Sequence, residues 1–214
     1  EFNVIMYALA SSSLENRTMK EQIHWMANSA RKHLPNDSYA AKMYDFVKQC
    51  YDKGMTWEEA RDAVYIRYQV NQEDGYNMTS KNIYCNGCFA GGINFAASIV
   101  SLLYGEGDLK ETIKIGTLAG WDSDNPTATW GGLLGFMNGK EGVEEAFGRT
   151  FSDKFNIHRT RRNFPNGVDN FNNMAKTGVF IVDRVVQDYL GGGIDLEKDV
   201  WYVPTQTSES NSTK

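Results

Sequence analysis

The sequence predicts an all-α fold, and three observations support this prediction. Two segments, Thr18-x-x-Glu21 and Thr56-x-x-Glu59, have the pattern of a helical capping box, in which the hydroxyl accepts an N–H of the first turn and the glutamate reaches back. Apolar residues after both segments recur at intervals of three and four, the period of an amphipathic helix. No alternating polar and apolar run is bounded by hairpin turns, so the sequence supports no sheet of any size.

The expected helices follow in order along the chain. The helix after Thr18 has its apolar positions at Ile23, Met26, Ala27, Ala30 and Leu34, and the helix after Thr56 has them at Ala60, Ala63, Val64 and Tyr68. The weakly polar stretch 89–105 is shorter than the roughly 20 apolar residues that a spanning helix needs, so it is interpreted as a buried helix and no membrane contact is expected. A further helix begins at Asp108, with Glu111 in its first turn, and ends near Gly120.

The last expected helix carries a long apolar stripe. Its members are Val168, Phe171, Met174, Ala175, Gly178, Ile181, Val182, Val185, Val186 and Tyr189, and the helix stops at the three glycines 191–193. The stripe is interpreted as a core-packing face. Residues 1–202 are therefore expected to form a single all-α domain, and the Ser/Thr-rich residues 203–214 a flexible tail.

Composition and charge exclude several classes of protein. With 41% hydrophobic and 23% charged residues and only 4 prolines, the chain of 214 residues has the balance of a globular protein rather than a disordered or collagen-like one. The formal net charge of −5, from 22 basic and 27 acidic residues, argues against a nucleic-acid partner, although Arg159, Arg161 and Arg162 form a local basic patch.

Cysteines and sequons bear on the compartment. The three cysteines are Cys50, Cys85 and Cys88, and the last two have the CxxC spacing of zinc and redox sites, with free thiols as the simplest alternative. N-x-S/T sequons occur at Asn16, Asn36, Asn77 and Asn211. This number slightly favours a secreted glycoprotein, while residues 1–10 lack the pattern of a signal peptide.

The segment 120–135 is the most informative part of the chain. Asp122 and Asp124 are expected on a link between two helices, with Pro126 in the first turn of the second helix. Two carboxylates one residue apart can face one hard divalent cation, with Ser123 and Asn125 as further oxygen donors. The alternative is that Asp124 or Asn125 merely caps the helix. Three glycines, at 131, 132 and 135, suggest that another backbone or a ligand approaches closely there.

This segment resembles the C-terminal signature of the ADP-ribosylglycohydrolase family, in which G-G/W-D-T/S-D precedes a helix of small residues. The preceding Leu-Leu-Tyr-Gly-Glu-Gly-Asp at 102–108 is similar to that family as well, and Asn94 stands where many members carry an asparagine. Segments 34–38 and 56–60 resemble the family's helical middle region. The likeness extends from Met19 to Tyr189.

The resemblance implies an all-α ADP-ribosylglycohydrolase-like helical bundle with a centre of two divalent ions, usually magnesium or manganese. Such a centre hydrolyses the glycosidic bond of ADP-ribose or a related glycosyl substrate. The implied metal ligands are Asp122, Asp124 and Asn125, the last in place of the family's usual threonine. The implied substrate-binding residues are Trp121, Ser123 and Asn94.

The family's N-terminal half carries a G-x-x-x-G-D-x-x-G segment and a second acidic cluster, and neither occurs in residues 1–22. We therefore expect an N-terminal half as a partner, present in one longer chain or as a separate polypeptide. Two other interpretations stay open. The protein is a non-catalytic binding or structural member of the fold, or it is a glycosidase of a substrate other than ADP-ribose.

Overall fold

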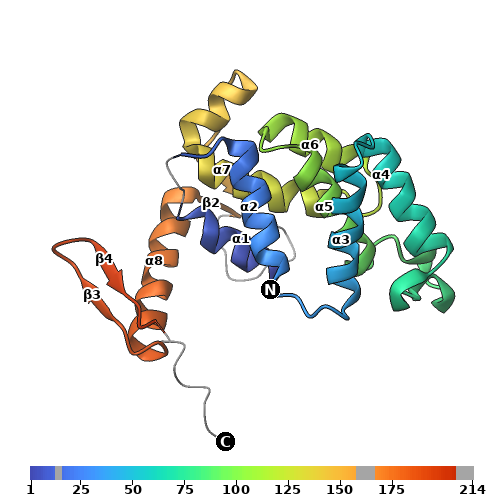
Figure 1. Cartoon of the computed structure of the whole chain (residues 1–214). Coiled ribbons are helices and arrows are strands. Elements are labelled where there is room, and N and C mark those ends of the chain that lie inside the picture. Colours follow the sequence, from blue (N-terminus) through green and yellow to red (C-terminus); the bar gives the residue numbers. More distant parts are fainter. Residues whose placement is uncertain (13–15, 158–166, 206–214) are drawn as a thin grey trace, which may run out of the picture. The chain divides into compact units, whose positions relative to one another are not determined.

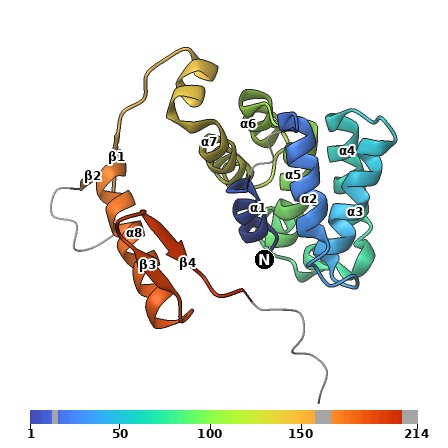
Figure 2. The ribbon, with the colours of Figure 1, turned by 60° about the vertical axis from the view of Figure 1, so that its left-hand side comes forward.

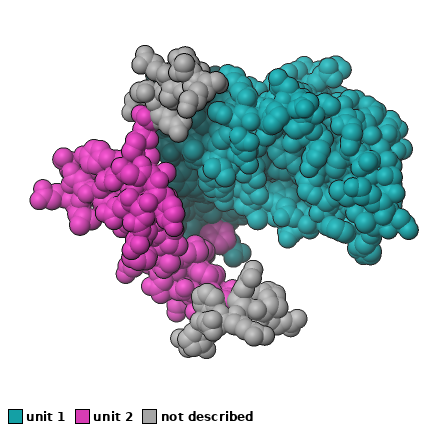
Figure 3. All heavy atoms as spheres, turned by 90° about the horizontal axis from the view of Figure 1, so that it is seen from below, with its two compact units in different colours: residues 1–149 teal, residues 150–214 magenta. Residues whose placement is uncertain are grey.

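The computed structural model describes residues 1–12, 16–157 and 167–205 (Figure 1). The chain divides into two compact units, Glu1–Arg149 and Thr150–Lys214, coloured separately in Figure 3. This division does not follow the single domain over 1–202 that the sequence predicts. Residues 206–214 of the predicted tail, with the Asn211 sequon, and the basic patch at Arg159, Arg161 and Arg162 lie outside the described residues.

The described residues of the first unit form seven α-helices. They are α1 (Phe2–Ala10), α2 (Met19–Arg31), α3 (Tyr39–Asp52), α4 (Trp57–Val64), α5 (Gly91–Tyr104), α6 (Leu109–Leu118) and α7 (Asp124–Phe147). A π-helical turn, Tyr65–Val70, extends α4, and the short 3₁₀ turns Glu73–Gly75, Met78–Lys81 and Tyr84–Gly87 lead to α5. The predicted all-α fold class is confirmed.

Helix α5 is the centre of this unit. Apart from Phe95, which is half-buried, every residue of 92–103 is buried. A helix that is apolar all round is stable only when other elements cover every side, and α5 packs against α3, α4, α6 and α7 (Figures 1 and 2). The predicted buried helix over 89–105 is confirmed. Within the described residues, no helix is long and apolar enough to cross a membrane.

The predicted helix starts are confirmed in their atomic detail. The Thr18 hydroxyl accepts the N–H of Glu21 at 3.2 Å, and the Glu21 carboxylate accepts the N–H of Thr18 at 2.8 Å. Thr56 and Glu59 make the same reciprocal pair. The Asp108 carboxylate accepts the N–H of Glu111 at 2.7 Å at the start of α6. Each bond satisfies a backbone donor that the first helical turn leaves without a partner.

The close approach predicted from the glycines of α7 is found at Gly132. A β-carbon there would lie 2.7 Å from the hydroxyl oxygen of Tyr7, which comes from α1 and donates to the carbonyl of Thr129 at 3.0 Å. At Gly131, by contrast, the nearest atom would be Ile113 Cδ1 at 3.6 Å, an ordinary contact. The absence of a side chain at Gly132 therefore allows α1 to bond α7.

The described residues of the second unit form one helix and two small antiparallel strand pairs. Strand β1 (Lys154–Asn156) pairs with β2 (Val168–Asn170), helix α8 spans Phe171–Asp188, and β3 (Gly193–Asp195) pairs with β4 (Val200–Tyr202). The sequence predicts no sheet, and strands of three residues are too short to show a period of two. The helix begins at Phe171 because Val168 belongs to β2.

The core role predicted for the apolar stripe of α8 is wrong within its own unit. Val186 is the one residue of α8 that is buried, whereas Phe171, Ile181 and Tyr189 are 50%, 56% and 82% exposed. The physical reason is size: the described residues of this unit, one helix and two pairs of three-residue strands, cannot enclose a continuous apolar face.

We expect the two adjacent glycines of α7 to respond differently to alanine. Gly131→Ala should stabilise the protein by about 0.5–1 kcal/mol, because alanine favours a helix interior. The free energy of unfolding of Gly132→Ala should be about 1 kcal/mol lower than that of Gly131→Ala, because its methyl group displaces the Tyr7 hydroxyl from the carbonyl of Thr129. Urea denaturation of both variants measures the difference.

The Tyr7→Phe background is the control, since removing the hydroxyl should make Gly132→Ala as favourable as Gly131→Ala. Equal effects of the two substitutions in the wild-type background would contradict the close approach.

Candidate functional site

The turn between α6 and α7 has an unusual backbone. Gly120 and Trp121 have φ angles of +97° and +56°, so two consecutive residues adopt left-handed conformations immediately before Asp122. Glycine adopts this conformation freely, but a tryptophan does so at a cost that contacts from elsewhere must offset. Asp124 is the first residue of α7 rather than part of the link, and Pro126 lies in the first turn.

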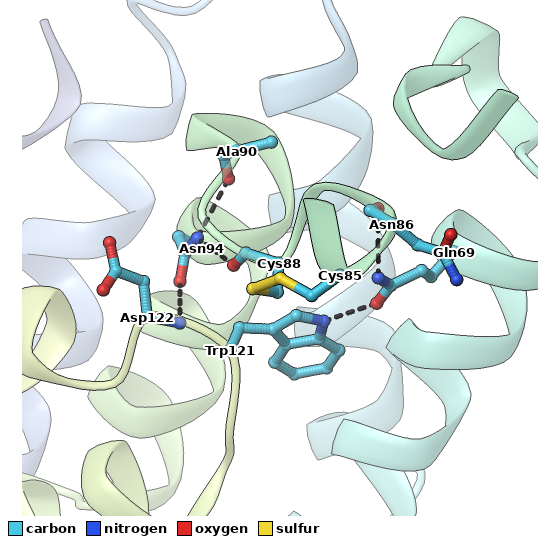
Figure 4. Close-up of a disulfide and its surroundings, with 8 residues drawn as sticks. All are labelled: Gln69, Cys85, Asn86, Cys88, Ala90, Asn94, Trp121 and Asp122. Carbon is cyan, nitrogen blue, oxygen red and sulfur yellow. Dashed lines mark hydrogen bonds between the residues drawn. A yellow bond between two sulfur atoms is a disulfide. The ribbon is translucent and has the colours of Figure 1, made fainter. Parts of the chain in front are cut away.

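Asn94 of α5 holds the backbone of Asp122 (Figure 4). Its side-chain oxygen accepts the N–H of Asp122 at 2.9 Å. Its side-chain nitrogen donates to the carbonyls of Cys88 at 2.8 Å and Ala90 at 3.0 Å. Asn94 is 8% exposed, and these bonds are directed to the chain itself. The sequence predicts Asn94 as a substrate-binding residue, whereas its contacts here are those of a positioning residue.

Gln69 holds the side chain of Trp121. The indole N–H of Trp121 donates to the Gln69 side-chain oxygen, and the Gln69 side-chain nitrogen donates to the carbonyl of Asn86 at 3.3 Å (Figure 4). Trp121 is half-buried and packs against the hydrophobic core. Sequence reasoning missed Gln69, because no local pattern marks a glutamine 52 positions before its partner.

Asp122 and Asp124 lie close enough for their carboxylates to affect each other. Hydrogen bonding with Asp124, and also its like charge, raises the pKa of Asp122 above the usual range. The Asn125 side chain acts in the opposite direction, since its nitrogen donates to an Asp122 carboxylate oxygen at 2.6 Å. Asp124 and Asn125 are exposed and Asp122 is half-buried. The two carboxylates therefore form an acidic pair at the surface.

The helix-capping alternative does not describe this turn. The residue before α7 is Ser123, and its side chain makes no capping hydrogen bond. Its carbonyl instead accepts the hydroxyl of Thr127 at 3.0 Å. Asp124 and Asn125 lie inside the helix, so neither occupies the capping position.

The acidic pair fits part of a site for a hard divalent cation. Carboxylate oxygens are the preferred ligands of magnesium and calcium, but such ions take about six oxygen ligands. Among the described residues, no group of three or more His, Cys, Asp or Glu side chains is gathered in a way that could hold a metal ion. Asn125 directs its N–H at Asp122, so in this arrangement it donates to the pair rather than adding a third acceptor. Further ligands are required beyond Asp122 and Asp124.

A disulfide lies beside the turn. Cys85 and Cys88 are bonded to each other. Of the alternatives that the CxxC spacing leaves open, the structure therefore has the oxidised pair, and neither cysteine is a free thiol or a zinc ligand in this state. Cys50 is a buried free thiol. The sequon residues Asn16, Asn36 and Asn77 are all exposed.

A comparison with models of known protein families agrees with the family that the sequence resembles. A family model described as ADP-ribosylglycohydrolase matches residues 2–170. The matched range contains α5, the α6–α7 turn and the acidic pair. Neither the curated proteins nor the solved structures contain a match.

Replacing Asn94 should cost far more stability than replacing Asn125. Asn94→Leu leaves the Asp122 N–H and the Cys88 carbonyl without their side-chain partner in a mostly buried place, while the Ala90 carbonyl keeps the backbone N–H of residue 94, so we expect a loss of about 1–3 kcal/mol. Asn125→Ala removes exposed hydrogen bonds and should change stability by less than about 0.5 kcal/mol. Urea denaturation compares the two, and equal losses would contradict the positioning role of Asn94.

The pKa of Asp122 should fall in the Asp124→Asn variant. The neutral amide removes the like charge and offers an N–H donor, so both changes favour the ionised form of Asp122. In the wild type the pKa is raised, so protonation of Asp122 favours the folded state, and this contribution is lost as the pH rises through that pKa. NMR titration of the Asp122 carboxyl carbon in both proteins measures the shift. An unchanged pKa in the variant would mean that the two carboxylates do not interact.

Proposed function

The chain belongs to the ADP-ribosylglycohydrolase family, and we propose that its α6–α7 turn is part of a divalent-metal centre for hydrolysis of the glycosidic bond of ADP-ribose or a related ribosyl substrate. The family suggests a glycohydrolase of ADP-ribose-type substrates; the metal and the exact substrate are the proposal. The single observation that carries it is the acidic pair, Asp122 and Asp124, held on a turn whose backbone is fixed by Asn94.

The two carboxylates have a specific electrostatic task. They lie at the start of α7, where the helix dipole places partial positive charge that attracts carboxylates and repels a cation. Both negative charges are therefore needed to hold a divalent ion there. Oxygen donors without histidine or sulfur favour magnesium or manganese over zinc. When bound, such an ion supplies Lewis-acid chemistry by lowering the pKa of water and polarising substrate oxygens.

The other residues of the turn would serve the substrate side of the site. Ser123 lies between the two carboxylates in sequence, and its hydroxyl makes no capping bond. Trp121 is oriented by Gln69 through its indole N–H, which leaves the ring as the part able to stack on a ligand. Asn94 would act on substrate only through the backbone of Asp122.

The remaining ligands, and a second ion, would require groups that the described residues do not gather. We propose that these come from the N-terminal half expected from the family, together with water. Asn125 would join them only after its amide turns its oxygen toward the ion.

A non-catalytic binding role is the second candidate. It is favoured by the absence of a third acidic, histidine or cysteine ligand near the pair in the described part of the chain. Such a protein would bind ADP-ribose equally well with and without manganese. Calorimetry with ADP-ribose, with and without the ion, separates the two functions.

Asp122→Asn and Asp124→Asn should each abolish manganese binding while leaving the helical content unchanged. Each variant removes one of two charges that must together overcome the helix dipole. Calorimetry with manganese, performed with the N-terminal half present, measures binding, and circular dichroism measures helicity. Asp37→Asn, at an exposed aspartate outside the turn, is the control. Equal affinity in all proteins would refute the metal site.

A further inference from the structure

We propose that the Cys85–Cys88 disulfide is a redox-sensitive support of the α6–α7 turn, so that its reduction releases Trp121 and Asp122 and weakens the site. The effect on the turn stands by itself. The effect on metal affinity rests on the proposed function.

The disulfide closes a backbone turn that is unfavourable for its residues. Cys85, Asn86 and Gly87 have φ angles of +43°, +53° and +78°, so three consecutive residues are left-handed. Only glycine adopts this conformation without a steric penalty. The bond between the side chains of Cys85 and Cys88 joins the two ends of this turn and restricts the alternatives available to it. We call residues 85–88 the disulfide turn.

The disulfide turn supports Asp122 through Asn94. The Cys88 carbonyl accepts one N–H of the Asn94 side chain at 2.8 Å, and the oxygen of the same side chain accepts the N–H of Asp122 at 2.9 Å. A movement of the Cys88 carbonyl therefore alters the orientation of the amide that holds Asp122.

The disulfide turn supports Trp121 through Gln69. The Asn86 carbonyl accepts the Gln69 side-chain N–H at 3.3 Å, and the Gln69 oxygen accepts the Trp121 indole N–H. Figure 4 shows both connections starting on the disulfide turn and ending on two successive residues, Trp121 and Asp122.

The α6–α7 turn depends on these hydrogen bonds from outside it. Gly120 and Trp121 are themselves left-handed, so the local backbone preference of Trp121 opposes the observed conformation. Two strained turns are thus joined by two side-chain amides, and the disulfide is the one covalent restraint among these elements. Releasing it lets the first turn relax and displaces the Asn86 and Cys88 carbonyls, so that Gln69 loses its acceptor on this turn and Asn94 keeps only the Ala90 carbonyl.

The chemistry is ordinary exchange with a dithiol reductant. Cys85 is exposed and Cys88 is half-buried. A thiolate of the reductant attacks the Cys85 sulfur, a mixed disulfide forms, and Cys88 leaves as a thiolate that takes up a proton. The second thiol of the reductant then displaces Cys85, which is also protonated. The protein gains two electrons and two protons, and the reductant becomes a disulfide. Cys50 takes no part because it is buried, and burial raises its pKa.

The test follows the Trp121 indole and Asp122 amide protons by ¹⁵N NMR. The full chain carries Cys50→Ser, so that the only thiols formed are those of the disulfide turn. On reduction with dithiothreitol, we expect the Trp121 indole signal to shift and the Asp122 amide to exchange with solvent about tenfold faster. The Trp130 indole is the internal control, because it donates to the Ser98 carbonyl in the core and should not move.

Two variants sharpen the test. Cys85→Ser combined with Cys88→Ser should show the reduced-state signals before and after dithiothreitol. Gln69→Glu keeps an acceptor for the Trp121 indole but lacks the N–H that binds the Asn86 carbonyl. In Gln69→Glu the Trp121 signal should therefore stop responding to reduction, while the Asp122 amide still responds through Asn94.

The outcomes separate this inference from the proposed function. Unchanged Trp121 and Asp122 signals on reduction, or alkylation of Cys85 and Cys88 before any reductant is added, would overturn it. Manganese affinity should also fall about tenfold on reduction, as expected when the residues that orient a metal ligand are disturbed. Signals that move in a protein that binds no manganese in either state would refute the metal site and retain the redox-sensitive turn.

Discussion

The hydrogen bond from the Asp122 N–H to the Asn94 side chain is the interaction on which the site depends. It joins the buried helix α5 to Asp122, a half-buried member of the acidic pair. Because α5 is covered by five other helices, α2, α3, α4, α6 and α7, Asn94 has a fixed position, and Asp122 takes its position from Asn94. The buried helix thereby restrains a surface turn whose own backbone conformation is unfavourable. A functional residue on a surface turn can therefore be held in place by the rigid helix beneath it rather than by the turn itself.

The forces at the acidic pair are balanced even in the protein alone. Hydrogen bonding with Asp124 raises the pKa of Asp122 most, and the repulsion between the two like charges raises it further. Against it act the partial positive charge at the start of α7 and the N–H that Asn125 donates. The turn is therefore able to form before any ligand arrives, and binding does not have to supply the folding of the turn.

Local features of the chain were predictable from the sequence and distant ones were not. Thr18, Thr56 and Asp108 determine helix starts through bonds to residues three positions away, so their pattern is visible in the sequence. The Gln69–Trp121 bond and the packing of Tyr7 on Gly132 depend on how separate helices meet, which no local pattern encodes. The apolar stripe of α8 illustrates the same limit. Its spacing of three and four residues predicts a helix with an apolar face, but it does not predict which element covers that face.

The left-handed tryptophan has a consequence for how this turn can change in evolution. The signature that this segment resembles has glycine or tryptophan at this position, and glycine would remove the steric penalty of the turn. It would also remove the indole and with it the link to Gln69. A lineage with glycine gains a relaxed turn but loses one of its two attachments to the cysteine pair. Trp121, Gln69 and the two cysteines should therefore be kept or lost together in related proteins.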